Sequence, residues 1–251
     1  MGSALAKAAK KSGAQIYIYD KDESKAQLLA DELSAKCLGN VKIAESCDYI
    51  FLAVKPNIIP IAIDEIRTGL LKNKKGTLVS MAAGVSLAKL AVMLGDLPII
   101  RIMPNTPAEV GYGMILYTAN EKGAGAVPLF LESMAAAGKF DAIDERLIDA
   151  ASAISGCGPA FVYMFIEALA DGGVMSGLPR DKAMLYAAET LIGAAEVVKQ
   201  TGRHPGALKD AVCSPGGSTI EGVKTLEDGK MRGTVSGAVV ASYEKTLKLG
   251  K

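Results

Sequence analysis

The segment from Tyr49 to Val54 is a continuous apolar run that ends abruptly at Lys55-Pro56. A run so short, and so rich in β-favouring side chains, is typical of a strand buried on both faces of a parallel sheet. Further strand-like runs occupy 15–19, 76–80, 97–102 and 113–118, and helical periodicity occupies 22–33, 58–71, 86–94 and 126–137. This alternation predicts an α/β fold with a doubly wound parallel sheet.

After about Asp144 the strand-like runs stop and helical periodicity takes over. In 179–200, apolar residues recur at three- and four-residue steps. The segment 161–175 is apolar almost all round, which predicts burial in a helical bundle or against a second subunit. We therefore predict a nucleotide-binding domain over 1–144 and an all-helical domain over 145–251, whose thin core favours dimerisation.

The charge balance and the rarest residues exclude several classes of function. Lys plus Arg number 28 and Asp plus Glu 27, so the chain lacks the basic excess of a nucleic-acid-binding protein. No apolar run approaches the roughly 20 residues that cross a bilayer, and 1–13 lack the apolar core of a secretory signal. We expect a soluble, cytoplasmic protein that binds neither nucleic acid nor membrane.

Histidine and cysteine are too scarce for a metal site. The four cysteines have no zinc-ligand spacing, and the only histidine, His204, lies in a turn where a surface or capping role is expected. An enzyme of this composition is expected to use a cofactor that brings its own reactivity.

The first residues match part of a dinucleotide-binding fingerprint. Gly2 stands where the third glycine of a GxGxxG turn would precede a helix, and Asp20 follows a strand where the ribose-binding acid belongs. The strand and the first two glycines of that fingerprint do not precede Gly2. We expect a truncated start at an internal methionine, since a doubly wound sheet without its central strand would leave edges unpaired.

Loops at three consecutive strand ends are the other cofactor candidates, since ligands bind beyond the carboxyl ends of parallel strands. They are Ala53-Val54-Lys55-Pro56, Met81-Ala82-Ala83-Gly84 and Met103-Pro104-Asn105-Thr106-Pro107, in which two prolines present the Asn105 amide. A tight turn without a ligand is the alternative interpretation of each loop alone. Together the three loops favour a dinucleotide site.

A glycine-rich segment in the helical half predicts an anion site. Ser218 and Glu221 have the spacing of a capping box, so we expect a helix that begins here with Ser218 as its cap. Pro215, Gly216 and Gly217 precede it and leave backbone N–H groups unshielded, which suits a carboxylate. A chain-reversing turn is the alternative.

Several motifs in this order resemble the pyrroline-5-carboxylate reductase family, which catalyses the last step of proline biosynthesis. They are Ala53–Pro56, Met103–Pro107, Ser155–Ala160, Glu167–Asp171, Gly177–Arg180, His204-Pro205, Leu208–Asp210 and Ser214–Ile220. The likeness covers the chain apart from the missing opening strand. It implies a Rossmann domain and a helical substrate-binding domain that intertwines with a partner's to form a homodimer or a larger ring.

The resemblance also assigns residue roles, with the substrate lying between the nicotinamide and the segment 214–219. It implies substrate binding by Ser214, Gly216, Gly217 and Thr219, and cofactor contacts by Ala53 to Pro56, Ala82 to Gly84 and Asn105. We also expect Ser218 to bind substrate as part of the same segment, and Gly2 and Asp20 to bind the cofactor as parts of the fingerprint. Thr219 is the expected catalytic residue, with its hydroxyl on the ring nitrogen of a cyclic imine.

The cofactor preference and two alternative functions stay open. Asp20 favours NADH because it repels a 2′-phosphate, whereas Lys21 and Lys25 could accommodate the phosphate of NADPH. A β-hydroxyacid dehydrogenase would need a lysine soon after Gly156-Cys157-Gly158, and none occurs from Pro159 to Asp171. A dinucleotide-binding module without turnover is the second alternative.

Overall fold

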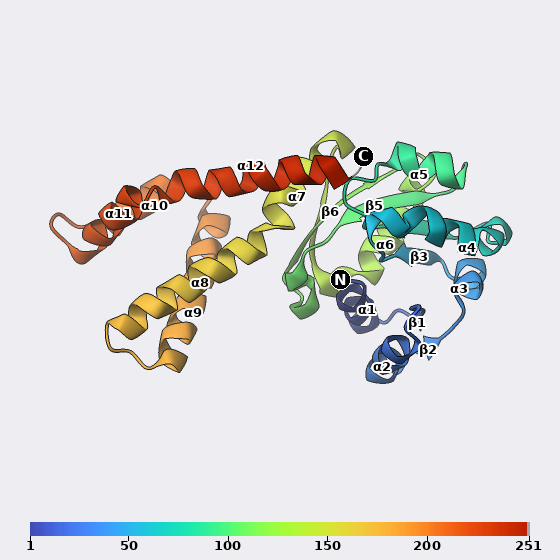
Figure 1. The fold of residues 1–251 in the computed structure, drawn as a ribbon, viewed down its shortest axis with the longest axis horizontal. Helices are drawn as coiled ribbons and strands as arrows, with labels where there is room; N and C mark the ends of the chain where they lie inside the picture. The colour runs from blue at the N-terminus through green and yellow to red at the C-terminus, as the bar shows by residue number, and fades with distance from the viewer. Residues whose placement is uncertain (250–251) are drawn as a thin grey trace. The chain divides into compact units, whose positions relative to one another are not determined.

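The strand-like runs form two separate sheets in the computed structural model, which describes residues 1–249 (Figure 1). The smaller sheet pairs β1 (Tyr17–Ile18) with β2 (Lys36–Cys37) in parallel. The larger sheet has the order β3-β4-β5-β6-β7, with bounds Tyr49–Leu52, Thr77–Ser80, Ile99–Met103, Gly113–Ala119 and Gly138–Ala142. Strands β3, β4 and β5 are parallel, whereas β6 runs antiparallel to β5, and β7 is parallel to β6. The sheet is therefore mostly parallel, with a reversed pair at one edge.

The order of these strands matches a doubly wound sheet interrupted at its centre. A common doubly wound sheet has the strand order 3-2-1-4-5-6. In that numbering, β1 and β2 correspond to strands 2 and 3, and β3, β4 and β5 correspond to strands 4, 5 and 6. Among the described residues, no strand corresponds to strand 1, so one edge of β1 and one edge of β3 have no strand partner.

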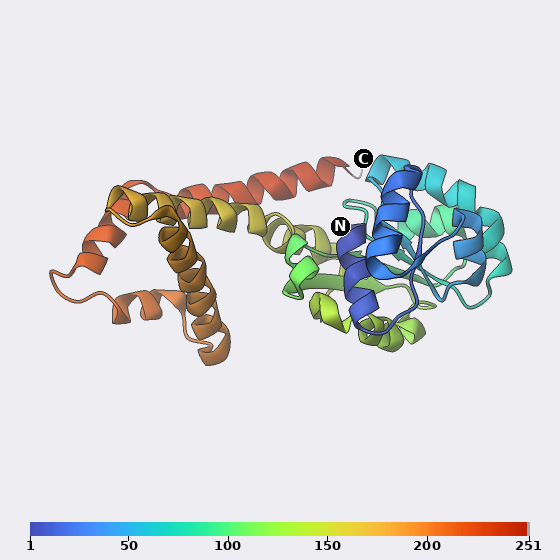
Figure 2. The same ribbon diagram turned by 90° about the horizontal axis from the view of Figure 1, so that it is seen from below.

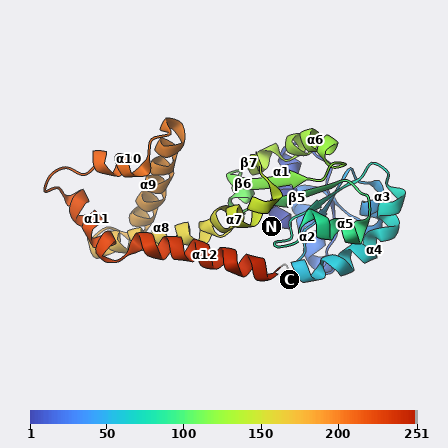
Figure 3. The same ribbon diagram turned by 90° about the horizontal axis from the view of Figure 1, so that it is seen from above.

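Helices cover both faces of the larger sheet (Figures 1 and 3). One face packs against α3 (Asn40–Ser46), α4 (Ile59–Lys72) and α5 (Leu87–Leu94), and the other packs against α1 (Gly2–Lys11) and α6 (Val127–Ser133). Neighbouring residues of β4 show the alternation, since Leu78 enters the first core and Val79 the second. Helix α2 (Glu23–Leu33) buries Ala26 and Ala30 against β1, in the layout visible in Figure 2.

Most predicted boundaries in this part are confirmed to within one or two residues. Asp22 and Ser86 lie one residue before α2 and α5, where their side chains accept the N–H of Lys25 and Lys89 as N-caps. Three elements lack a pattern in the sequence that predicts them: β2, α3 and β7. The short 3-10 helices lie at Pro56–Ile58, Thr106–Val110, Ala124–Ala126 and Ala135–Ala137.

After β7 the described chain is helical. Its helices are α7 (Glu145–Ser155), α8 (Gly158–Met175), α9 (Arg180–Thr201), α10 (Pro205–Ala211), α11 (Ser218–Asp228) and α12 (Met231–Leu249). The pair α8 and α9 shares a small core in which Ala170, Ala183 and Ala187 are buried. Predicted burial of 161–175 does not occur within the single chain, since Tyr163, Met164 and Met175 are exposed.

The run Glu145–Met175 corrects the expectation that no segment is long and apolar enough to cross a bilayer. By length and composition this run passes that criterion, and the core helix of a soluble protein passes the same test.

Two compact units divide the described chain elsewhere than at the predicted domain boundary. The first contains Met1–Cys157 and the described part of the segment from Ala241 onward, and the second contains Gly158–Val240. Helix α7 thus belongs to the unit that carries the sheets.

Candidate functional site

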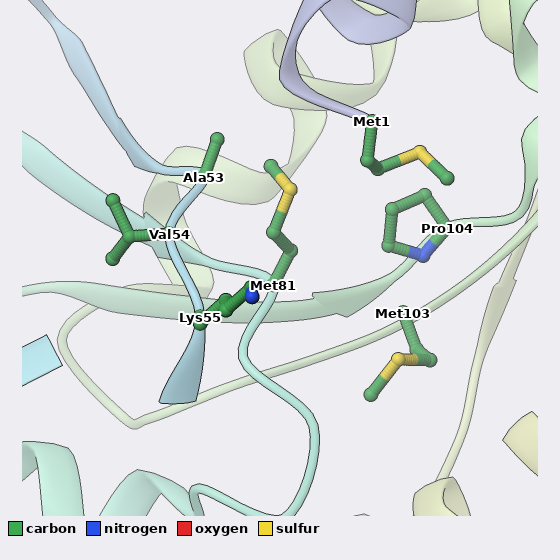
Figure 4. A pocket seen from close by; sticks show the side chains of 7 residues that line it. All are labelled: Met1, Ala53, Val54, Lys55, Met81, Met103 and Pro104. Atoms are coloured by element: carbon green, nitrogen blue, oxygen red, sulfur yellow. The ribbon is translucent and has the colours of Figure 1, made fainter. Parts of the chain in front are cut away.

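A pocket of about 250 Å³ lies at the carboxyl ends of β3, β4 and β5 (Figure 4). Its lining comes from the start of α1 and from the loops that follow those three strands: Met1, Ala53, Val54, Lys55, Met81, Met103 and Pro104. Three consecutive parallel strands therefore contribute to one pocket, at the edge where doubly wound sheets bind their ligands.

Close packing of Gly2 sets where α1 begins. A Cβ atom on Gly2 would lie 2.9 Å from the Cβ atom of Ala53, closer than real Cβ atoms approach. The glycine therefore lets the first turn of α1 meet the loop after β3, and no side chain caps that turn. Free N–H groups at a helix start are an anion site. This cradle fits the pyrophosphate of a dinucleotide.

The walls of the pocket are soft and apolar. Met1, Met81 and Met103 surround its opening in Figure 4, and Lys55 supplies an exposed cation. Thioethers are polarizable and adapt to irregular shapes, so this lining suits a flat ring. Met81 and Met103 begin two of the strand-end loops predicted from the sequence, whereas Met1 was not predicted as part of the site.

The turn Ala82-Ala83-Gly84 directly follows a residue of the pocket lining. Ala82 is buried and its N–H donates to Oγ of Ser80 at 3.4 Å, and Gly84 has φ +73°. The N–H of Val85 closes the turn on the carbonyl of Ala82 at 3.3 Å. Met81, the residue before the turn, is the one that lines the pocket.

Asn105 is buried, and both the nitrogen and the oxygen of its side-chain amide form hydrogen bonds. Its Nδ2 donates to the carbonyl of Ser155 at 2.9 Å, and its Oδ1 accepts the N–H of Met114 at 2.9 Å. The side chain thus joins the end of β5 to β6 and to the end of α7, and it fixes the turn that contains Pro104.

Asp20 lies in a second pocket of about 310 Å³, at the carboxyl ends of β1 and β2. The pocket is lined by Ile18, Tyr19, Asp20, Glu23, Ala26, Gln27, Cys37, Leu38 and Gly39. Oδ1 of Asp20 accepts the N–H of Asp22 at 2.9 Å, which holds the carboxylate at the strand end. Hydrogen bonds from Ser24 first, and then from Lys25, lower the pKa of Asp22 to about 2.

The glycine-rich segment of the second unit precedes α11, but the predicted capping box is wrong. The helix begins at Ser218, and its N-cap is Gly217 without any side-chain hydrogen bond. The turn before it explains the shift, because Gly216 has φ +66° and the N–H of Gly217 donates to the carbonyl of Ser214 at 3.0 Å. Ser218 and Thr219 are exposed in an uncapped first turn, as an anion site requires.

His204 has the capping role that the sequence suggests. Its Nδ1 accepts the N–H of Gly206 at 3.1 Å at the start of α10. Within residues 1–249, no group of three or more His, Cys, Asp or Glu side chains could hold a metal ion.

Together, the Rossmann-like sheet, the pocket at its strand ends and the following helices define a dinucleotide-binding oxidoreductase fold. Residues 1–84 match the family described as NADP oxidoreductase, coenzyme F420-dependent, and residues 145–249 match pyrroline-5-carboxylate reductase dimerisation. The chain belongs to the pyrroline-5-carboxylate reductase family.

Relatives cover most of its length. It is 44% identical to a pyrroline-5-carboxylate reductase of Arabidopsis thaliana over 84% of this chain and 76% of the plant protein. It is 43% identical to that of Escherichia coli over 94% of this chain and 88% of the bacterial protein. The crystal structure of Plasmodium falciparum pyrroline carboxylate reductase with NADP bound is similar with a TM-score of 0.90, at 33% identity over 100% of this chain and 96% of that one.

Proposed function

We propose that this chain reduces 1-pyrroline-5-carboxylate to L-proline with NADPH or NADH as the electron donor. The observation that carries the proposal is membership of a reductase family at 44% identity over 84% of the chain. A nucleotide pocket at three strand ends and an uncapped, glycine-preceded helix supply the two binding functions that the reaction needs.

The first turn of α11 is the proposed anchor for the substrate carboxylate. The backbone N–H groups of Ser218 and Thr219 lie in the first turn of the helix, where the helix dipole favours a negative charge. Ser214 and Gly216 form the turn that precedes the helix. No side chain accepts a hydrogen bond from the first turn of the helix as an N-cap, so a ligand would not have to replace one.

Thr219 is the proposed catalytic residue. The reaction adds a hydride to the carbon and a proton to the nitrogen of the C=N bond, so one C–H and one N–H bond form as the double bond becomes single. When bound, a reduced nicotinamide supplies the hydride. The Thr219 hydroxyl donates a hydrogen bond to the ring nitrogen, directly or through water, and helps to protonate it.

On the nucleotide side, Gly2 and the loop from Ala53 to Pro56 hold the pyrophosphate and the nicotinamide in the 250 Å³ pocket. The turn Ala82-Ala83-Gly84 and Asn105 keep Met81 and Pro104 in place around it. Asp20 contacts the adenosine ribose.

We also propose a division of labour along the chain. Residues 1–144 bind the nucleotide, and 145–251 bind the substrate and join a partner as an intertwined homodimer or a larger ring. The apolar residues that α8 exposes, with Met164 69% and Met175 88% accessible, support self-association. All four cysteines are free thiols, which supports action in the reducing cytoplasm.

The test is oxidation of NADPH or NADH, followed by absorbance, when 1-pyrroline-5-carboxylate is added to the purified chain. We expect turnover, and we expect Thr219→Ala to lower kcat/KM by about one to three orders of magnitude, roughly 1.4 kcal/mol per factor of ten. Thr225→Ala, later on the same exposed helix, is the matched control and should leave kcat/KM unchanged. Nucleotide binding without oxidation would indicate a non-catalytic module, and full activity of Thr219→Ala would remove that hydroxyl from the mechanism.

A further inference from the structure

The pocket that contains Asp20 carries information on which nucleotide the chain selects. It lies at the carboxyl ends of β1 and β2, and its polar lining includes the carboxylates of Asp20 and Glu23. In a doubly wound fold, the residue at the end of this strand meets the adenosine ribose, whose 2′ position is a hydroxyl in NADH and a phosphate in NADPH. The charges around this pocket therefore decide between the two.

Negative charge dominates the pocket. Asp20 is held at the strand end by the N–H of Asp22, at 2.9 Å, and Glu23 starts α2 on the same wall. Asp22 adds a third carboxylate beside them, fixed by Ser24 and Lys25 at the start of the helix. A carboxylate accepts a hydrogen bond from a ribose hydroxyl, but it repels a phosphate dianion.

The nearby cations are already engaged with carboxylates. Nζ of Lys21 lies 3.2 Å from Oε1 of Glu65, and Nζ of Lys25 lies 3.2 Å from Oδ2 of Asp22. A 2′-phosphate would have to draw a lysine from its partner and then sit beside two acids. Arginine, the usual partner of a 2′-phosphate, does not occur anywhere from Ala14 to Lys36.

We propose that Asp20 and Glu23 make this chain select NADH over NADPH. The inference rests on the proposed function only in placing the adenosine ribose at this pocket. The selection acts on nucleotide binding and needs no substrate.

Equilibrium titration of the purified chain with each reduced nucleotide, followed by nicotinamide fluorescence without substrate, tests it. We expect NADH to bind about tenfold or more tightly than NADPH. Raising the salt concentration to about 0.5 M should narrow the gap, because screening weakens repulsion between the acids and the phosphate.

Two variants with the same change of net charge separate a local from a general effect. Asp20→Asn should tighten NADPH binding about tenfold while leaving NADH binding equal or weaker. Asp64→Asn, at an exposed position of α4 where Asp64 pairs with Arg67, is the control and should move neither dissociation constant. Glu23→Gln should shift the ratio in the same direction as Asp20→Asn.

The outcomes distinguish this inference from the proposed function. NADPH binding as tight as NADH binding in the unaltered chain would overturn it, as would an equal shift of both nucleotides in Asp20→Asn. Failure of both nucleotides to bind would overturn the inference and the proposed cofactor site together. Preferential NADH binding without reduction of 1-pyrroline-5-carboxylate would support the inference and contradict the proposed function.

Discussion

Gly2 is a position where a hydrogen atom is the largest side chain that the packing accepts. Its missing Cβ atom would lie 2.9 Å from the Cβ atom of Ala53, so any side chain would push the start of α1 from the loop after β3. The consequence concerns the nucleotide pocket, because Met1 and Ala53 are both in its lining.

We expect Gly2→Ala to weaken nucleotide binding about tenfold and to lower the free energy of unfolding by roughly 1–3 kcal/mol, the usual effect of overpacking. Isothermal titration calorimetry with NADH and urea denaturation measure the two effects. Gly125→Ala is the control, because a Cβ atom there would meet nothing within 4 Å. Wild-type affinity in Gly2→Ala would show that the close contact does not shape the pocket.

Asp22 gives α2 a pH-dependent start. Its pKa, lowered to about 2 from the ordinary 3.8, means that the folded chain holds the ionised form more tightly than the unfolded chain does. The carboxylate therefore contributes stability above pH 3.8, and this contribution is lost as the pH falls through 3.8 towards 2.

The difference in urea midpoint between the wild type and Asp22→Ala should accordingly be largest near neutral pH and shrink as the pH falls from 3.8 through about 2. Asp22→Asn keeps a capping oxygen, so it should retain part of the stability at neutral pH and show a weaker pH dependence. A gap that stays constant from neutral pH to pH 2 would contradict an ionised cap.

At the scale of elements, a buried ion cluster joins β5 to α7 and α5. Arg101 is 1% exposed in the middle of β5, and its guanidinium donates to Oε1 of Glu145 at 3.2 Å and to Oδ1 of Asp149 at 2.6 Å. The same Oε1 accepts the N–H of Leu87 at 2.6 Å, so the cluster also satisfies the first turn of α5. Removal of the arginine leaves two half-buried carboxylates without the cation that pairs them.

Arg101→Met should lower the free energy of unfolding by about 3–5 kcal/mol, as expected when one partner of a buried ion pair is removed. Urea denaturation measures it. Arg146→Met is the control. Arg146 lies on α7 next to Glu145, but it is exposed and pairs with Asp144, so its removal should change the free energy of unfolding little. Adding Glu145→Gln and Asp149→Asn to Arg101→Met should recover part of the loss, and an additive further loss would contradict the cluster.

Helices and strands with a local sequence pattern were predicted, whereas elements that form only through pairing with distant parts of the chain were not. The helices predicted over 22–33 and 86–94 and the strand predicted in 49–54 are visible in the sequence because their patterns act within a few residues. Strand β7 has mixed, mostly exposed residues, and its pairing with β6 across some twenty intervening residues defines it. In the sequence, Arg101 is a charged residue within an apolar strand. Its partners Glu145 and Asp149 lie far along the chain, and only the fold brings α7 beside it.

At the scale of the whole molecule, topology predicted where the nucleotide pocket lies and which strand-end loops line it, but not that Met1 completes the lining. The carboxyl ends of β3, β4 and β5 follow from the strand–helix alternation, whereas Met1, Met81 and Met103 meet there through packing. The cofactor contact predicted for Asn105 stays a prediction, and the fold adds a structural role, because its amide also binds the backbone of Ser155 and Met114. Ser218 looked like a cap, and the left-handed Gly216 moved that role to Gly217.

Helix α8 exposes several large apolar side chains that its own chain does not cover. Val162, Tyr163 and Met164 are 44%, 56% and 69% exposed on consecutive positions, whereas Ala170 alone is buried among the residues of that helix. Contiguous apolar patches of this kind mark protein interfaces, and residues 145–249 match a dimerisation family.

Met164→Glu should therefore weaken self-association at least 100-fold, roughly 2.7 kcal/mol, because a carboxylate would have to be buried against apolar side chains. Sedimentation equilibrium measures the change, with Leu28→Glu as the control, since Leu28 is 72% exposed on α2 of the other unit. The separated chains should keep their helical circular dichroism, because Met164 contributes little to the core of its own chain. An unchanged association constant for Met164→Glu would place the contact surface away from α8.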